Sequence, residues 1–351
     1  MTSVQSRDRE HASAREILAP DPVAPVVALR SVPSFSVVIA AYQVADMIGD
    51  AIQSVLDQTR PPLEVIVVDD GSTDEIESAV QPFGAQVKFL RREHRGAAAT
   101  MNAGVEAASG DYVCFIGADD LFEPERLEAL GGLVAARPDI DVVTTDAWLS
   151  LRGEVFRRFN DDTHPFEAKN QRQAILERNF VFGHTAVRRA RFIEVGGFDE
   201  SIRWTSDWEL WARMILGGSA VGSVNEPLAK YRLHEETLSA KRLQQARGRL
   251  MTCGRILEHP SLTASERQHA ERTADTIRRE IEWGEAKEAI LEHAGDARAR
   301  SFRVMADSRQ SLNVRVFALL SVVVPSLTRA VLTRRQSRYW TAAGGVRVRR
   351  S

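Results

Sequence analysis

Between residues 35 and 117 the chain alternates short apolar runs with helical patterns. Four runs rich in β-branched residues are typical of buried strands, namely 35–42, 64–70, 86–90 and 111–117. Helical patterns lie between them, over 45–59, 72–80 and 96–108, the second with Ser72 or Thr73 as its expected N-cap. Strands that alternate with helices pair in parallel through right-handed crossovers. The sequence therefore predicts an α/β fold with a Rossmann-like, mostly parallel sheet and helices on both faces.

Two pairs of carboxylates stand where predicted strands end. Asp69 and Asp70 close the second strand, and Asp119 and Asp120 follow the fourth. Because ligands bind beyond the carboxyl ends of parallel strands, both pairs are expected at one rim of the sheet. Each pair also has an ordinary explanation, an Asp-Gly turn for the first and a solvated turn for the second. Mg²⁺ prefers carboxylate and phosphate oxygens, so a cation site at this rim is the functional alternative.

Two later segments carry side chains of chemical interest. In TSDWELWAR, Asp207 stands at the expected start of a helix, either as its N-cap or as a general base whose pKa an apolar surrounding raises. Trp204, which precedes that helix, is the tryptophan that could line an acceptor site. In YRLHEE, Arg232 and His234 lie on one face of the last expected strand. They are either structural or reach metal-bound phosphates.

The two ends of the chain differ from its middle. Residues 1–34 are polar and interrupted by prolines, which predicts a mobile leader. Residues 301–351 contain ten arginines and one acidic residue, although the whole chain has a formal net charge of −2. That average argues against a nucleic-acid-binding protein, and the basic end is typical of a solvated or surface-binding extension. Its apolar run, 316–327, fits either an interfacial helix on an anionic membrane or a helix that packs on protein.

The cysteines and the hydropathy of the sequence indicate the cellular location of the protein. Cys114 and Cys253 have no metal-binding spacing and suggest no disulfide framework. The first twenty residues lack the apolar segment of a signal peptide, and no run reaches the roughly 20 apolar residues of a membrane span. We therefore expect a cytoplasmic protein, with membrane contact at most through its C-terminal end.

The order of these motifs resembles the family 2 glycosyltransferases with the GT-A fold, inverting enzymes that use nucleotide-activated sugars. SVVIAAYQ is similar to the family's opening strand, and EVIVVDDGSTD is similar to the block that follows it. GDYVCFIGADD is similar to the strand that leads into the family's aspartate-rich metal loop. The motifs GGFDE, SDWELW and YRLH then follow in the family's order. The resemblance covers about residues 35–240.

The resemblance implies a nucleotide-binding half over 35–120, an acceptor half over 121–240 and a helical extension over 241–351. It implies transfer from a UDP- or dTDP-sugar to a hydroxyl of a saccharide or lipid-linked acceptor, in cell-surface polysaccharide or glycolipid synthesis. Asp207 would deprotonate the acceptor, and Asp119 with His234 would hold Mg²⁺ or Mn²⁺. The residues expected around the donor are Ala41, Tyr42, Asp69, Asp70, Gly96, Asn102, Ala118, Asp120 and Arg232.

Three positions depart from the family's pattern and leave alternatives open. Gly117 stands where the metal motif usually begins with aspartate, Ser206 replaces the acidic residue before the base, and Met101 replaces an arginine. A non-catalytic nucleotide-sugar-binding subunit is therefore one alternative. A sugar-phosphate nucleotidyltransferase is another, but it would need a glycine-rich, basic phosphate loop after the first strand. The segment AAYQVADMIGD contains no such loop.

Overall fold

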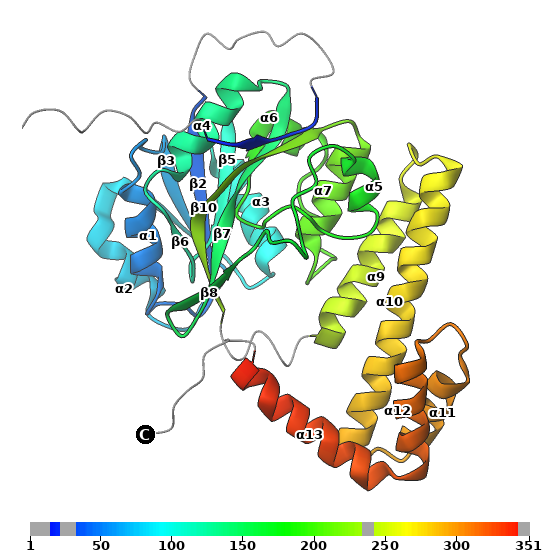
Figure 1. The fold of residues 1–351 in the computed structure, drawn as a ribbon. Coiled ribbons are helices and arrows are strands. Elements are labelled where there is room, and N and C mark those ends of the chain that lie inside the picture. The colour runs from blue at the N-terminus through cyan, green and yellow to red at the C-terminus, as the bar shows by residue number, and fades with distance from the viewer. Residues whose placement is uncertain (1–14, 22–32, 234–241, 343–351) are drawn as a thin grey trace, which may run out of the picture.

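A mixed sheet forms the centre of the computed structural model, which describes residues 15–21, 33–233 and 242–342 (Figure 1). Two short strands, β6 (Leu121–Phe122) and β8 (Glu154–Arg158), pair with β10 and β7. The main strands, from one edge to the other, are β1 (Ile17–Leu18), β10 (Ala220–Leu233), β7 (Ile140–Leu151), β9 (Ala186–Arg188), β5 (Tyr112–Gly117), β2 (Phe35–Ala41), β3 (Glu64–Asp69) and β4 (Val87–Arg91).

The sheet is mostly parallel, as the sequence predicts. Strands β5, β2, β3 and β4 pair in parallel, and so do β10 and β7. Between these two groups lies β9, which is antiparallel to both of its neighbours. The carboxyl ends of β2, β3 and β5 consequently meet at one rim.

Helices cover both faces of the sheet, which confirms the predicted fold class. On β2 the side chain of Val38 belongs to one core cluster, whereas those of Val37 and Ile39 belong to the other. Alternate side chains of a strand point to opposite faces, so each face needs its own apolar cover. The covering helices are α1 (Ile48–Leu56), α2 (Ile76–Val80), α3 (Ala97–Ala107), α4 (Arg126–Ala136), α5 (Gln171–Ile175), α6 (Arg189–Glu194) and α7 (Ser206–Leu216), with a 3₁₀ helix over Gln81–Gln86.

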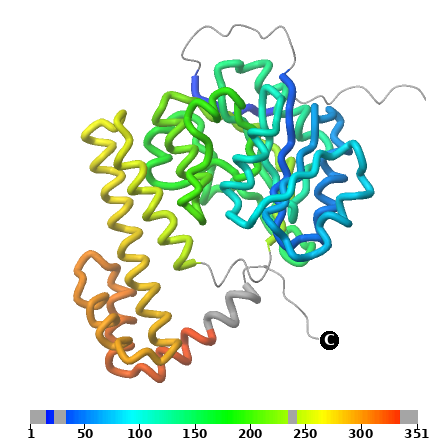
Figure 2. The backbone as a smooth tube through the Cα atoms, turned by 180° about the vertical axis from the view of Figure 1, so that it is seen from behind, coloured from blue at the N-terminus to red at the C-terminus, as the bar shows by residue number. Residues whose placement is uncertain are grey.

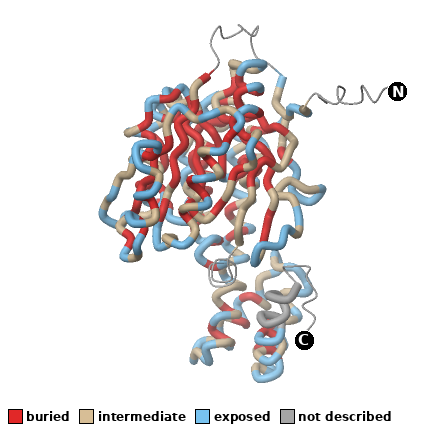
Figure 3. The backbone as a smooth tube through the Cα atoms, turned by 90° about the vertical axis from the view of Figure 1, so that its left-hand side faces the viewer, coloured by how far each residue is buried: buried red, intermediate tan, exposed pale blue. Residues whose placement is uncertain are grey.

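Beyond the sheet the chain is helical. Helix α10 begins at a capping box, in which Thr263 and Glu266 bond each other's backbone N–H, and it packs along α9. Figures 1 and 2 show α10 leading away from the sheet, with α11, α12 and α13 at its far end. In Figure 3 the buried residues concentrate in the sheet region. The helices are α9 (Arg242–Glu258), α10 (Ala264–Leu291), α11 (Ala297–Ala306), α12 (Leu312–Val323) and α13 (Pro325–Ala342).

The structure corrects two local predictions. Part of the predicted mobile leader forms β1, where Ile17 pairs with Val224 of β10. The leader contributes backbone hydrogen bonds to a sheet edge, an interaction that polarity and prolines do not reveal. The second helix starts at Ile76 instead of Ser72, because the Ser72 hydroxyl accepts a hydrogen bond from Gln43 N at 3.0 Å and is held in the loop.

Among the described helices, none has the length and apolarity needed to cross a bilayer.

Candidate active site

The predicted donor residues gather at the carboxyl rim of the sheet. In the strand register Ala41 lies beside Asp69, and Ala40 lies beside Gly117. The backbone of Ala118 continues this pairing, since its N–H donates to Ala40 O at 3.0 Å. Parallel pairing therefore brings together side chains that are far apart in the sequence.

The two aspartates that follow β3 have different environments. Both carboxylate oxygens of Asp70 accept backbone hydrogen bonds, from Arg95 N at 2.9 Å and from Gly96 N at 2.8 Å. Asp70 therefore shapes the loop that leads into α3, where Gly96 is the N-cap with a φ of +94°. Asp69 accepts a hydrogen bond from Ser72 N through Oδ1, whereas its buried Oδ2 has no hydrogen-bond partner in the described structure and lies 3.5 Å from Arg91 Nε. Within this pair, Asp69 is the residue with a carboxylate oxygen that accepts no hydrogen bond.

An aromatic pair flanks this rim. The exposed ring of Tyr42 stacks on His94, with ring centroids 4.3 Å apart and an interplanar angle of 28°. His94 Nδ1 also lies 2.9 Å from Asp70 Oδ2. The stack presents a flat surface next to the carboxylates, and such a surface suits a planar base.

The two aspartates that follow β5 also differ in their burial. Asp120 is buried, and its oxygens contact Arg232 N at 2.8 Å and His184 Nε2 at 2.7 Å. Asp119 is half-buried and its carboxylate folds back over Gly117. A Cβ at Gly117 would lie 2.6 Å from Asp119 Oδ1, closer than real Cβ atoms come. The glycine therefore allows the conformation that Asp119 adopts.

His184 is a site residue that the sequence analysis missed. Its buried ring packs edge-on against Phe182 and Tyr231, with centroids 4.7 and 5.9 Å away. Its Nε2 is bonded to Asp120, while its buried Nδ1 has no hydrogen bond within the described ranges. The only signal in the sequence was a polar residue inside the apolar run FVFGHTAV. No motif spacing connects it with Asp120, which is 64 positions away.

Arg232 links the last strand to the loop of Asp119. Its Nε donates to the backbone carbonyl of Asp119, and its Nη1 lies 3.6 Å from Asp50 Oδ2. The remaining nitrogen, Nη2, is buried without a hydrogen-bond partner in the part of the chain that the structure describes. A guanidinium so placed can receive an anionic oxygen. His234, predicted as a metal or phosphate partner, lies outside the described residues.

Asp207 is the second residue of α7, and the N-cap is Thr205. The N-cap interpretation of Asp207 was therefore wrong. Asn179 Nδ2 donates to Asp207 Oδ2 at 2.8 Å, and burial raises the pKa of the Asp207 carboxyl. Burial also raises the pKa of Tyr231, and the negative charges of Asp120, Asp119 and Asp207 raise it further. The loop after β5 and the start of α7 therefore both contribute negative charge near this tyrosine.

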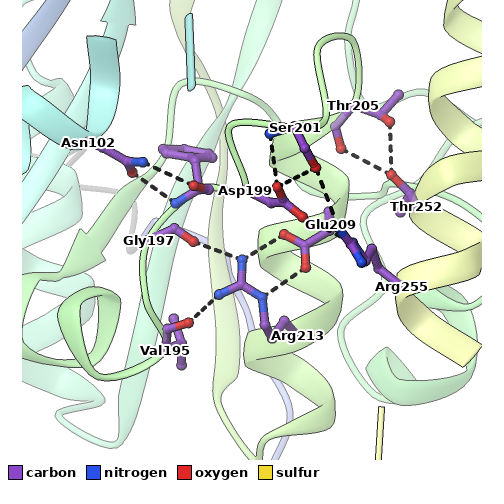
Figure 4. Close-up of polar contacts among 11 residues, drawn as sticks. Asn102, Val195, Gly197, Asp199, Ser201, Thr205, Glu209, Arg213, Thr252 and Arg255 are labelled. Atoms are coloured by element: carbon purple, nitrogen blue, oxygen red, sulfur yellow. Dashed lines mark hydrogen bonds and ion pairs between the residues drawn. The ribbon is translucent and has the colours of Figure 1, made fainter. Parts of the chain in front are cut away.

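The GGFDE segment holds α7 in place (Figure 4). On one side the Asn102 amide exchanges hydrogen bonds with the Phe198 backbone at 3.0 and 2.9 Å. On the other, Arg213 pairs with buried Glu209 at 2.6 Å and donates to Gly197 O at 2.8 Å. Asn102 was predicted to contact the donor, but these bonds give its amide a structural role. The network steadies the helix that carries Asp207.

A cavity of about 340 Å³ lies between the start of α7 and helices α9 and α10. Thr205 contacts α9 through the hydroxyl of Thr252, at 2.9 Å. The partly exposed ring of Trp204 contributes an aromatic surface three residues before Asp207. The cavity is lined by Trp204, Thr205, Arg242, Gln245, Arg249 and Glu280.

Comparison with known proteins identifies the family. The model of "Glycosyl transferase family 2" matches residues 36–196. A PGL/p-HBAD biosynthesis glycosyltransferase of Mycobacterium bovis is 30% identical over 202 residues, which are 55% of this chain and 77% of that protein. The chain belongs to glycosyltransferase family 2. A putative teichuronic acid biosynthesis glycosyltransferase of Bacillus subtilis, TuaG, is 29% identical over 61% of this chain and 85% of its own.

Solved structures support the GT-A fold. A mannosyltransferase from Pyrobaculum calidifontis, in complex with GDP-Man and Mn²⁺, superposes with a TM-score of 0.57 at 18% identity, over 93% of this chain and 90% of its own. This chain spans only part of some relatives, between 35% and 68% of the length of several glycosyltransferases from Rickettsia. As a member of this family, the protein is a glycosyltransferase.

Proposed function

We propose that this glycosyltransferase is metal-dependent and inverting, and that it moves a sugar from a nucleoside diphosphate to an acceptor hydroxyl. The observation that carries the proposal is the carboxyl rim, where Ala41 lies beside Asp69 and the loop of Asp119 and Asp120 is bonded to Arg232 of the last strand. We infer that the donor binds at this rim and that Asp207, whose pKa burial raises, faces the acceptor. Such an arrangement suits a reaction that needs both leaving-group stabilisation and proton removal.

The donor would bind across the rim between β3 and β5. The Tyr42–His94 stack offers a face for the base, and Asp69 Oδ2, which accepts no hydrogen bond but lies 3.5 Å from Arg91 Nε, is an acceptor for a base N–H. The buried Nη2 of Arg232 lies on the phosphate side, beside the Asp119 loop. We propose a UDP- or dTDP-sugar as the donor, and the mannosyltransferase complex shows that a similar fold holds a nucleotide sugar with Mn²⁺.

A divalent ion fits this site only together with the donor. The described residues include no group of three or more His, Cys, Asp or Glu that could hold a metal by itself. Both oxygens of Asp120 contact protein donors, and Asp119 is the residue that the family resemblance assigns to Mg²⁺ or Mn²⁺. One carboxylate plus substrate phosphates is a common way to hold Mg²⁺. The ion, when bound, would offset negative charge on the departing diphosphate.

Asp207 would act as the general base. Its raised pKa makes the carboxylate a better proton acceptor than a solvated aspartate, and Asn179 fixes its orientation at 2.8 Å. Removal of the acceptor proton lets the hydroxyl oxygen attack the anomeric carbon as the bond to the diphosphate breaks. Attack from the opposite side inverts that carbon.

The acceptor would be a saccharide or lipid-linked intermediate of cell-surface polysaccharide or glycolipid synthesis. The relatives named for teichuronic acid and PGL/p-HBAD biosynthesis support this class. Trp204 and the cavity beside it offer an aromatic surface for a sugar ring. We further propose a cytoplasmic location, with peripheral membrane contact through the C-terminal helices.

A thermal-shift screen tests the donor proposal. UDP, dTDP, GDP and ADP, with their sugars, are added to the full chain with and without Mn²⁺. We expect one nucleotide family to raise Tm, and more strongly with Mn²⁺, because ion and diphosphate complete one site. If no nucleotide raises Tm under either condition, the donor site is wrong. If a nucleotide sugar binds but no acceptor or water ever consumes it, the non-catalytic binding subunit is the better description.

A further inference from the structure

Helix α12 exposes five of its large aliphatic residues. Their side chains are between 42% and 71% exposed, values more usual for lysines and glutamates. These residues are Leu312, Val316, Leu319, Leu320 and Val323, and their intervals of four, three, one and three positions put them on one helical stripe. Val324 and Leu327 extend the exposed apolar surface into the start of α13. We define the α12 stripe as Leu312, Val316, Leu319, Leu320 and Val323.

Packing on the other side fixes the outward direction of the α12 stripe. Ala318 and Ser321 are buried, and Phe317 packs edge-on against Trp283 of α10, with centroids 5.6 Å apart. The Arg315 Nε donates to Met305 O at 2.9 Å and ties α12 to α11. Since α12 packs inward through Ala318, Ser321 and Phe317, a rotation that buried the stripe would expose Ala318 and break these contacts. The stripe therefore needs a cover from outside the described fold.

Charge around the α12 stripe indicates which cover it takes. Residues 301–351 hold ten arginines against the single acidic Asp307. Four of the arginines lie on α12 or on the segments next to it, namely Arg303 on α11, Arg309 in the loop before α12, Arg315 on α12 and Arg329 on α13. In a symmetric pair of copies the same basic surface would face itself and repel. An anionic lipid surface offers a hydrocarbon layer for the stripe and phosphates for the arginines.

We propose that the α12 stripe inserts into the interface of an anionic membrane, with α12 lying in the membrane plane. This inference deepens the membrane contact of the proposed function, but it does not depend on sugar transfer. Helix α10 has 28 residues, a length of about 42 Å, and the stripe lies near its C-terminal end. The membrane contact would thus be a separate site from the carboxyl rim, and it would hold the enzyme near a lipid-linked acceptor.

Vesicle sedimentation with the full chain tests the inference. We expect wild-type protein to bind vesicles of equal parts phosphatidylcholine and phosphatidylglycerol, to bind phosphatidylcholine alone weakly, and to lose binding as salt rises. The triple variant Val316→Ser, Leu319→Ser, Leu320→Ser should bind anionic vesicles at least tenfold more weakly. Its nucleotide-induced rise in Tm should equal that of wild type, so a failed donor site is recognised separately.

A matched control replaces three exposed aliphatic residues of the sheet region. Leu63→Ser, Val155→Ser and Ile193→Ser remove side chains that are 46–55% exposed, and vesicle binding should stay at the wild-type level. If the triple α12 variant does not fold, Leu312→Ser with Val323→Ser removes the two most exposed positions instead. Equal binding by wild type and the α12 variants overturns the proposal. So does a wild-type dimer that dissociates in the α12 variant while neither protein binds vesicles, which identifies a second copy as the cover.

Discussion

Helices α7 and α12 are nearly equal in length, with 11 and 12 residues, and both carry a broad apolar face. Helix α7 turns Trp208, Leu210 and Trp211 into the core beneath the candidate site, whereas α12 turns Leu319 and its stripe outward. The two helices show that an apolar face demands a cover without specifying which one. In α7 the cover is the sheet and α9, and the acidic residue at its start becomes a half-buried carboxylate.

Removing the α7 carboxylate should have the largest effect. Asp207→Asn keeps the size of the side chain and an acceptor for Asn179, but it removes the proton acceptor. We expect kcat to fall roughly 10²- to 10⁴-fold, the range typical of a general base. The same change at Asp307, between α11 and α12, should leave kcat unchanged. A wild-type rate for Asp207→Asn would remove the base from the proposal and end the functional contrast between the helices.

The pKa of Asp207 also sets the sign of the pH dependence. Because burial raises this pKa above the ordinary value of 3.8, kcat/KM should fall as pH drops through the raised value. Stability runs the other way, since the folded state binds the proton more tightly than the unfolded state and loses stability as pH rises through that window. At neutral pH Asp207→Asn should therefore unfold at a Tm no lower than that of wild type. A large drop in its Tm would mean that the lost activity reflects misfolding.

The same substitution, leucine to alanine, made once in α7 and once in α12, compares how much a buried and an exposed side chain contribute to stability. Leu210→Ala removes a buried side chain and leaves a cavity, so the free energy of unfolding should fall by about 2–5 kcal/mol. Leu319→Ala removes an exposed side chain and should change it by no more than about 0.5 kcal/mol. Urea unfolding of the full chain in the absence of lipid measures both. Similar losses for the two variants would show that the α12 stripe is already covered by protein.

The smallest effect concerns the metal-side loop. Gly117→Ala places a Cβ 2.6 Å from Asp119 Oδ1 and 3.1 Å from Asp120 Oδ2, so the Asp119 carboxylate must move. A displacement of this kind should lower the transfer rate by roughly 10- to 100-fold and weaken Mn²⁺-dependent donor binding. Gly132→Ala in α4, where the new methyl group meets nothing within 4 Å, is the control and should keep full activity. Full activity in Gly117→Ala would show that Asp119 is not held in its working position by the glycine.

Much of the fold could be predicted because its determinants are local. The β-branched runs that form β2, β3 and β5, and the apolar spacing of α1, need only nearby residues to be recognised. Elements that depend on distant partners were missed. Strand β1 exists because Ile17 and Leu18 meet β10 more than 200 positions away, and the start of α2 moved because Gln43 holds Ser72 in the loop.

The candidate site, too, was predictable from the sequence only in part. The sequence determined by itself that Asp69, Asp70, Asp119 and Asp120 follow strands of one parallel sheet, so their arrival at one rim was predictable. It could not determine which members of the pairs are already occupied by protein donors. Tertiary contacts decided that, because Asp70 is bonded by the loop before α3, and Asp120 by His184 and the backbone of the last strand.

The C-terminal helices follow the same principle. Sequence patterning determined that residues 312–323 have an apolar helical face and basic neighbours, which left a membrane and a protein partner equally open. Only the tertiary structure decided that α12 packs on α10 and α11 through Ala318 and Phe317, and that the five residues of the α12 stripe stay exposed. Periodicity is a property of the chain alone, whereas burial depends on what other segments bring to that face.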